Sequence, residues 1–219
     1  MATKQILADL VAAYQAASGQ AVAVESVGGV DAAKRVQAGE AIDLVILARN
    51  AMDQLQAAGK LVDGSLRDLV RSGVAVGIRS GTARPDISSE DAVKKAVMAA
   101  PTLGYSTGPS GVQLAKLFER WGIAESVKSR IVQAPPGVPV GALIARGEVA
   151  LGFQQLSEML NVTGVELVGM LPPAIEIITT FSGAVASTCA NPQAAADLLA
   201  FMASPAAALT IQQNGMTPA

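Results

Sequence analysis

Along this chain of 219 residues, segments with apolar residues at helical spacing alternate with short continuous apolar runs. Where apolar residues recur three and four apart we expect helices, and short apolar runs bounded by glycine or proline predict strands. The expected strands are 21–29, 42–48, 72–81, 102–105, 130–134, 149–154, 165–170 and 176–187. The expected helices are 4–17, 31–37, 52–58, one from 89, 111–120, 140–145, 157–160 and two that start at the Asn-Pro and Ser-Pro pairs 191–192 and 204–205.

Strands that alternate with helices predict an α/β fold with mixed, mostly parallel sheets. In such sheets ligands bind at the carboxyl ends of strands, beside the first turns of helices. The junctions between a strand and the next helix are therefore where we look for a functional site.

Three such junctions have the same design, with glycine and small residues placed just before a helix. They read SVGGVDAAKRV (26–36), YSTGPSGVQLA (105–115) and PPGVPVGALIA (135–145), and a fourth, GFQQLSEM (152–159), adds two neutral amide side chains. Exposed amides and the helix dipole make each a potential anion site. Glycine-rich turns are also common simply as turns, and no P-loop or GxGxxG motif is present.

The candidate ligand-binding residues come from these junctions and from the start of the chain. They are Thr3, Ser26, Gly28, Gly29, Thr107, Ser110, Gly111, Val138, Gln154 and Gln155.

Three acidic residues near the junctions are candidates for proton transfer: Glu25, Asp31 and Glu158. A carboxylate becomes an effective general base when it is desolvated. The alternative for each is a solvated side chain or a helix cap, and Asp31 in particular suits the first turn of a helix.

Composition removes several classes of function. The chain has no histidine, one cysteine (Cys189), a net charge of −2 and no basic patch. We therefore expect no disulfide, no multi-cysteine metal site, no histidine-activated nucleophile and no nucleic-acid partner, and we predict neither a metal nor a cofactor. Cys189 is interpreted as a small buried hydrophobe.

The order of the segments resembles the molybdate-binding family of bacterial type II solute-binding proteins. The resemblance rests on residues 26–62, on LFERWGI (117–123), on ARGEVALGFQQLSEM (145–159) and on the closing ANPQAAADLLAFMASPAAALTIQQNGM (190–216). It implies a two-lobed fold, with one lobe at 1–78 plus 176–219 and the other at 79–175. Two crossing strands would form the hinge, and closure would trap a ligand in the cleft.

The chain departs from the family at the residues that grip molybdate. Serine hydroxyls at the first two junctions would correspond to Thr3 and to Gly28-Gly29-Val30, and the family's tyrosine position falls on Gln155. We therefore expect a small organic acid rather than molybdate. The first hypothesis is a solute-binding protein of a transporter, monomeric and without membrane insertion.

The second hypothesis is a cofactor-free isomerase, because some proteins that resemble this family isomerise small di- or tricarboxylic acids such as aconitate. A positioned carboxylate and anion-holding amides suffice for that reaction. A third reading is a ligand-sensing domain that reports to a partner.

The start of the chain bears on the compartment. The family's first strand precedes the helix that we place at 4–17, and no signal peptide is visible in residues 1–20. We expect an upstream segment that holds this strand, with a periplasmic location by resemblance, or a cytoplasmic one if Met1 is the true start. The uncharged run 177–196 is interrupted by polar residues and is not predicted to span a membrane.

Overall fold

The computed structural model describes residues 2–135 and 137–219. The chain folds into two compact units, one of Met1–Ser72 with Thr179–Ala219 and the other of Gly73–Ile178. It passes from one unit to the other within the long strand β2 (Arg67–Arg79) and again at the start of β7 (Ile178–Val185).

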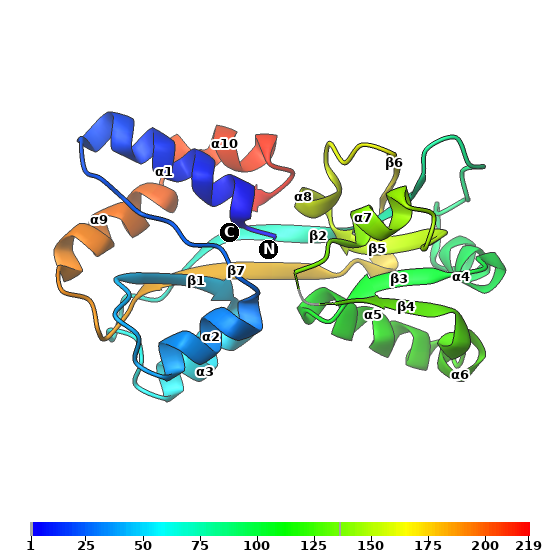
Figure 1. Ribbon diagram of the computed structural model, residues 1–219, viewed down its shortest axis with the longest axis horizontal. Coiled ribbons are helices and arrows are strands. Elements are labelled where there is room, and N and C mark those ends of the chain that lie inside the picture. The colour runs from blue at the N-terminus through cyan, green and yellow to red at the C-terminus, as the bar shows by residue number, and fades with distance from the viewer. Residues whose placement is uncertain (1, 136) are drawn as a thin grey trace. The chain divides into compact units, whose positions relative to one another are not determined.

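Unit 1 has helices on both faces of a small sheet. β1 (Leu44–Ala48) pairs antiparallel with β7, and the first half of β2 pairs with β8 (Thr217–Pro218). Figure 1 shows α1, α9 and α10 on one side of β1 and β7, and α2 and α3 on the other. The helices are α1 (Lys4–Ser18), α2 (Gly29–Gln37), α3 (Arg49–Ala57), α9 (Pro192–Met202), the 3₁₀ turn Pro205–Ala207 and α10 (Ala208–Gln213).

Alternate side chains of β1 belong to two apolar clusters, one on each face of the sheet. Val45 and Leu47 pack with α2 and α3, whereas Leu44 and Ile46 face the cluster of α1, α9 and α10. This is the period-2 geometry of a strand covered on both faces. The amphipathic face predicted for residues 4–17 is confirmed, because Ile6, Leu10, Val11 and Tyr14 are buried.

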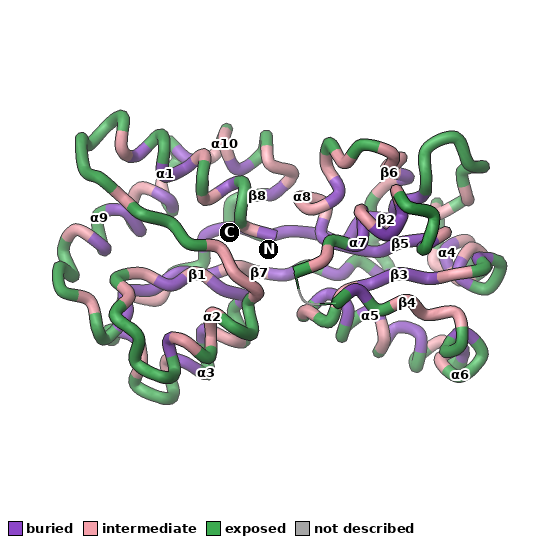
Figure 2. Tube along the Cα trace, in the orientation of Figure 1, coloured by how far each residue is buried: buried purple, intermediate pink, exposed green. Residues whose placement is uncertain are grey.

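The strand predicted at 21–29 is wrong. Residues 19–28 connect α1 to α2 without regular structure, and Figure 2 shows most of this connection exposed. Within the described part of the chain, residues 21–27 form no backbone–backbone hydrogen bond, and the Val22 amide donates to the Gln15 side chain instead. An alternating apolar pattern specifies a strand only when a neighbouring strand supplies hydrogen-bonding partners.

Unit 2 is built on a sheet of five strands that includes the second half of β2. Its strands are β3 (Leu103–Ser106), β4 (Ile131–Ala134), β5 (Leu151–Gln155) and β6 (Val165–Met170). Its helices are α4 (Glu90–Ala99), α5 (Pro109–Arg120), α6 (Ala124–Val127), the 3₁₀ turn Lys128–Arg130, α7 (Val140–Ala145), α8 (Leu156–Met159) and the 3₁₀ turn Pro173–Ile175.

The sheet is mixed, and parallel pairing is less prevalent than the sequence suggested. β3 lies between β4 and β5 and pairs parallel with both. β2 pairs antiparallel with β5, β6 and β8, and β1 pairs antiparallel with β7. Parallel pairing needs a crossover helix between the strands, which α5 and α7 supply for β3, β4 and β5.

In the described residues, no single helix is long and apolar enough to cross a membrane. α9 and the helical segment 205–213 are together long and apolar enough, but the chain bends by 57° between them. Its Ala195, Leu198, Leu199 and Met202 are buried against α1 and β2, so the apolar character of α9 is explained by the core of unit 1.

Four aromatic rings pack together in the otherwise aliphatic core of unit 2. Phe118 of α5 is fully buried and packs against Tyr105 of β3, Phe153 of β5 and Trp121. The ring centroids lie 6.0–6.3 Å apart, within the range of favourable aromatic pairs. This cluster fixes α5 against the sheet and thereby places the loop before α5.

Phe118→Ala is expected to destabilise unit 2 by about 3–5 kcal/mol, because it leaves a cavity among three rings. Thermal unfolding would show a melting temperature lower by on the order of 10 °C. The matched control is Val112→Ala on the exposed side of the same helix, which should change it little. Equal effects of the two substitutions would contradict the packing described.

Candidate functional site

The parallel strands of unit 2 end at the same edge of the sheet. Ser106 at the end of β3 lies opposite Ala134 at the end of β4, and Tyr105 lies opposite Phe153 of β5. The loops that follow therefore begin side by side and lead into α5, α7 and α8. The structure thus brings together, in one unit, the three predicted junctions at 105–115, 135–145 and 152–159.

The first junction is shaped by a close approach of α5 to β3. Gly108 is the N-cap and Pro109 the first helical residue, so α5 starts two residues before the predicted 111. Ser110 and Gly111 are buried in its first turn, and Thr107 is exposed in the loop. A Cβ atom on Gly111 would lie 1.8 Å from the Ser106 carbonyl oxygen, so packing by itself requires glycine there.

The first-turn amides of α5 have no acceptor earlier in the helix, as at any helix start. The Ser106 hydroxyl accepts a hydrogen bond from the Gly108 amide at 3.4 Å. Together with the hydroxyls of Thr107 and Ser110, this loop offers neutral donors and no charge. Such a group of donors can hold a carboxylate without a fixed positive charge.

The second junction is partly occupied by the protein's own hydrogen bonds. The Val138 amide donates to the Pro135 carbonyl at 3.0 Å, so its role as a ligand donor is not supported by this geometry. The Gly141 amide in the first turn of α7 donates to Gln154 Oε1 at 3.3 Å. Gly141 was not among the residues singled out from the sequence, because only its contact with the Gln154 side chain shows that it belongs to this junction.

Gln154 links α7 to the carboxyl of Glu158. Its Oε1 accepts from Gly141, and its side chain also forms a hydrogen bond with Glu158 of α8. Gln154 is fully buried, so its orientation is fixed by these partners. Burial raises the pKa of the Glu158 carboxyl above its ordinary value, while the Gln154 hydrogen bond opposes that rise. Among the three acidic candidates Glu158 alone is half-buried, whereas Glu25 and Asp31 are exposed.

Gln155 occupies the other face of β5. Successive side chains of a strand point to opposite faces, so Gln154 lies toward α7 and Gln155 toward α5, the side on which Phe153 meets Phe118. Both amides are buried at the end of β5. The two neutral amide side chains expected from the sequence therefore lie on opposite faces of the sheet at the end of β5.

The candidates in unit 1 lie around the start of α2 and before α1. Ser26 and Gly28 are half-buried in the connection before α2, Gly29 is its first residue, and Thr3 precedes α1 without capping it through its side chain. The Asp31 carboxylate lies beside Gly28, where a Cβ atom would be 3.4 Å from Asp31 Oδ2. Asp31 therefore places its own negative charge at this helix start, consistent with its alternative role in the first turn.

Glu25 belongs to an exposed cluster of ion pairs. Arg35 donates two hydrogen bonds to Glu25, at 2.7 and 2.8 Å, and further ones to Glu40. The hydrogen bonds and charge of Arg35 lower the pKa of Glu25. A carboxylate stabilised in its ionised form is a weak base, so we assign Glu25 no part in proton transfer.

The described residues contain no group of three or more histidine, cysteine or acidic side chains placed to hold a metal. Cys189 is partly buried, and burial together with its hydrogen bond to Asp43 raises the pKa of its thiol. A raised thiol pKa disfavours the reactive thiolate. Cys189 is only half-buried, between exposed neighbours, so the small buried hydrophobe predicted from the sequence is not what the structure shows.

This mixed α/β fold is similar to that of the type II periplasmic binding proteins. The molybdate-binding protein of Azotobacter vinelandii matches with a TM-score of 0.80 at 17% identity, covering 98% of this chain and 95% of that one. The substrate-binding domain of a putative molybdenum ABC transporter from Clostridium difficile matches with a TM-score of 0.77 at 17% identity, covering 100% and 95%. At these identities the likeness shows the fold alone.

The chain belongs to the family of bacterial extracellular solute-binding proteins, whose model matches residues 1–217. A curated relative, an aconitate isomerase of a Pseudomonas species, is 38% identical over 218 residues, which span 96% of this chain and 82% of that protein.

Gly111→Ala tests whether packing alone demands glycine at the start of α5. The added methyl group would collide with the Ser106 carbonyl, and we expect a loss of about 1–3 kcal/mol in unfolding experiments with urea. Gly108→Ala is the matched control, since its Cβ atom would lie 3.5 Å from the Ser106 hydroxyl, an ordinary contact. The idea fails if Gly108→Ala is the more damaging of the two.

Glu158→Gln tests the raised pKa through stability. Between the ordinary glutamate pKa and the raised value, the folded protein binds more protons than the unfolded chain, so this carboxyl's contribution to stability falls as pH rises. The stability of Glu158→Gln relative to the parent should therefore increase from about pH 4 to about pH 8. Urea unfolding at each pH measures this difference in the free energy of unfolding, and Glu125→Gln, at an exposed glutamate, is the control. A difference that does not vary with pH would rule the raised pKa out.

Proposed function

We propose that the protein binds a small unsaturated di- or tricarboxylic acid and isomerises it without a cofactor. The observation that carries this proposal is the partly buried Glu158 carboxyl, held by Gln154 at the strand edge where neutral amides and hydroxyls gather. The 38% identity to an aconitate isomerase supports the same chemistry, and aconitate is the first substrate to try.

The reaction needs one group that takes a proton from carbon and returns it. The ionised Glu158 removes a proton from the methylene carbon next to the double bond, and the electron pair left behind spreads over the allylic carbons and the adjacent carboxylate. The protonated Glu158 then returns the proton to the other end of the allylic system, so the double bond moves. Atoms and charge balance with no oxidant or metal, and a carboxyl with a raised pKa suits both steps.

The neutral donors of the edge have a separate task in this proposal. Thr107, Ser110 and the first-turn amides of α5 bind a substrate carboxylate, which fixes the methylene carbon relative to the base. Gln154 is a positioning residue, because it acts on the substrate through the orientation of Glu158.

Deuterium uptake distinguishes isomerisation from binding. We expect cis- or trans-aconitate incubated with the protein in heavy water to gain deuterium at its methylene carbon, followed by NMR. Glu158→Gln should reduce the rate by at least about a hundredfold, the usual contribution of a general base. Glu125→Gln, which changes an exposed glutamate of α6, should leave it unaltered. An equal rate in Glu158→Gln and the parent would refute the role of Glu158.

The second candidate function is binding of an organic acid without chemistry, as a transporter's solute-binding protein. Its support is membership of the solute-binding family and the likeness to transporter components. It predicts that aconitate or a related acid raises the melting temperature while the NMR spectrum of the acid stays unchanged in heavy water. That pair of results would favour binding over isomerisation.

A further inference from the structure

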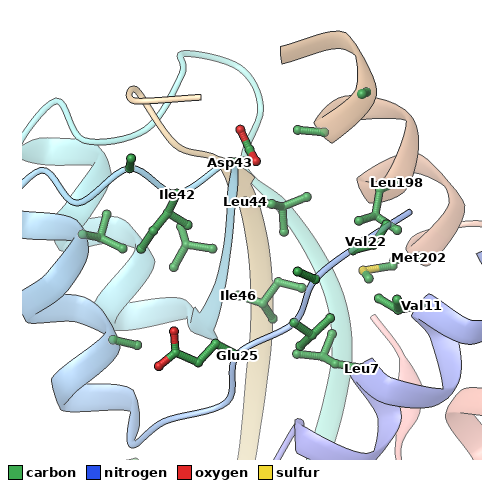
Figure 3. A pocket seen from close by; sticks show the side chains of 18 of the residues that line it. Leu7, Val11, Val22, Glu25, Ile42, Asp43, Leu44, Ile46, Leu198 and Met202 are labelled. Atoms are coloured by element: carbon green, nitrogen blue, oxygen red, sulfur yellow. The ribbon is translucent and has the colours of Figure 1, made fainter. Parts of the chain in front are cut away.

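Figure 3 shows a cavity of about 560 Å³ in unit 1, lined largely by aliphatic side chains of β1, α1, α9 and the connection between α1 and α2. No contact among the described residues identifies an occupant, so we assign it no ligand. All of its lining residues belong to unit 1, whereas Glu158 and its partners lie in unit 2. The contacts around Glu158 carry a further inference.

α8, the helix that carries Glu158, is too short to hold its own position. It consists of Leu156–Met159, and the Leu160 amide closes it by donating to the Leu156 carbonyl at 3.0 Å. Even helices of about 12 residues are only marginally stable in water by themselves. The position of the Glu158 carboxyl therefore depends on the segments that flank α8.

The segment after α8 turns through a left-handed residue. Asn161 has a φ of 59°, and among the described residues it is the one non-glycine residue with a positive φ. Leu160 before it has φ −60° and ψ 134°. These angles match the central residues of a type II turn, whose second central position favours glycine or asparagine. The turn thus fixes the direction in which the chain leaves α8.

This turn brings the next residues onto α7. A Cβ atom on Gly141 would lie 3.3 Å from both γ-carbons of Val162, so the two methyl groups of Val162 rest on the bare backbone of the first turn of α7. A Cβ atom on Gly164 would lie 3.3 Å from the Cβ atom of Ala145, the last residue of α7. Residues 162–164 therefore pack against both ends of α7.

Gly141 joins this packing to the hydrogen bonds around Glu158. Its amide donates to Gln154 Oε1 at 3.3 Å, and the Gln154 side chain is hydrogen-bonded to Glu158. A distance of 3.3 Å lies just beyond the usual N–H···O range of about 2.7–3.2 Å. A small further displacement of α7 would break this hydrogen bond, so the packing of Val162 on Gly141 bears directly on it.

We propose that Val162 is a positioning residue for the isomerisation, acting on Glu158 through Gly141 and Gln154. Its two methyl groups hold the first turn of α7 in place, so that the Gly141 amide fixes Gln154 and Gln154 orients the Glu158 carboxyl. The left-handed turn at Asn161 sets Val162 in this position. The inference rests on the proposed function, because an effect on the reaction presupposes that Glu158 is the base.

The first test does not depend on activity. Val162→Ala removes both methyl groups that contact Gly141, and hydrogen exchange of the Gly141 amide should become at least about tenfold faster. Val162→Ile keeps a branched side chain and should retain the exchange of the parent protein. Thr163→Ala is the matched control, since Thr163 is an exposed residue of the same loop. Unchanged exchange at Gly141 in Val162→Ala would overturn the proposal.

The second test follows deuterium uptake by aconitate. In Val162→Ala the kcat should fall by about ten- to a hundredfold while KM stays within about twofold, because the base is displaced and the carboxylate donors of α5 are not. Val162→Ile and Thr163→Ala should retain the kcat of the parent protein.

A double-mutant cycle tests the route of the effect. In a Gln154→Ala background, Val162→Ala should change kcat little further, because both substitutions act through the same hydrogen bond. An equal loss of kcat in both backgrounds would overturn the route through Gln154. Absence of deuterium uptake with the parent protein would refute isomerisation and with it the catalytic role of Val162. Faster exchange at Gly141 in Val162→Ala would then still show that Val162 holds α7, so the two failures are distinguishable.

Discussion

The parallel pairing of β3 with β4 and β5 is the constraint on which the candidate site depends. It ends three strands at one edge, so that three loops distant in the sequence start beside one another. Everything at the site follows from this register, including the contact of Gly141 with Gln154 across 13 residues of chain. A shift of β5 by one residue would exchange the faces of Gln154 and Gln155 and separate Glu158 from its partner.

Local patterns predicted most elements, because each of these is stabilised by its own sequence together with a nearby core. The strand at 165–170 has the predicted bounds, and the Asn191 side chain accepts the capping hydrogen bond that Asn-Pro predicts. The strand predicted at 21–29 failed for a non-local reason. AVAVESV has the alternation of a strand, yet no strand of the described residues hydrogen-bonds to it.

The sequence predicts which junctions form the candidate site, but not the hydrogen bonds and charges that surround each side chain there. Glycine and hydroxyl residues before helices are visible in the sequence, whereas the difference between Glu25 and Glu158 is not. The hydrogen bonds and charge of Arg35, ten residues away, lower the pKa of Glu25, whereas burial raises the pKa of Glu158. Two identical side chains thus acquire opposite tendencies from tertiary surroundings that no local pattern encodes.

The loop from Ser106 to Gly111 carries no charged residue, and this has a consequence for discrimination. Oriented amide and hydroxyl dipoles act over short distances, so such a surface would not attract anions indiscriminately from afar. Association there would depend little on ionic strength. It would depend instead on whether the acceptor atoms of an incoming anion match the positions of these fixed dipoles. The loop would therefore discriminate between anions by their shape more than by their net charge.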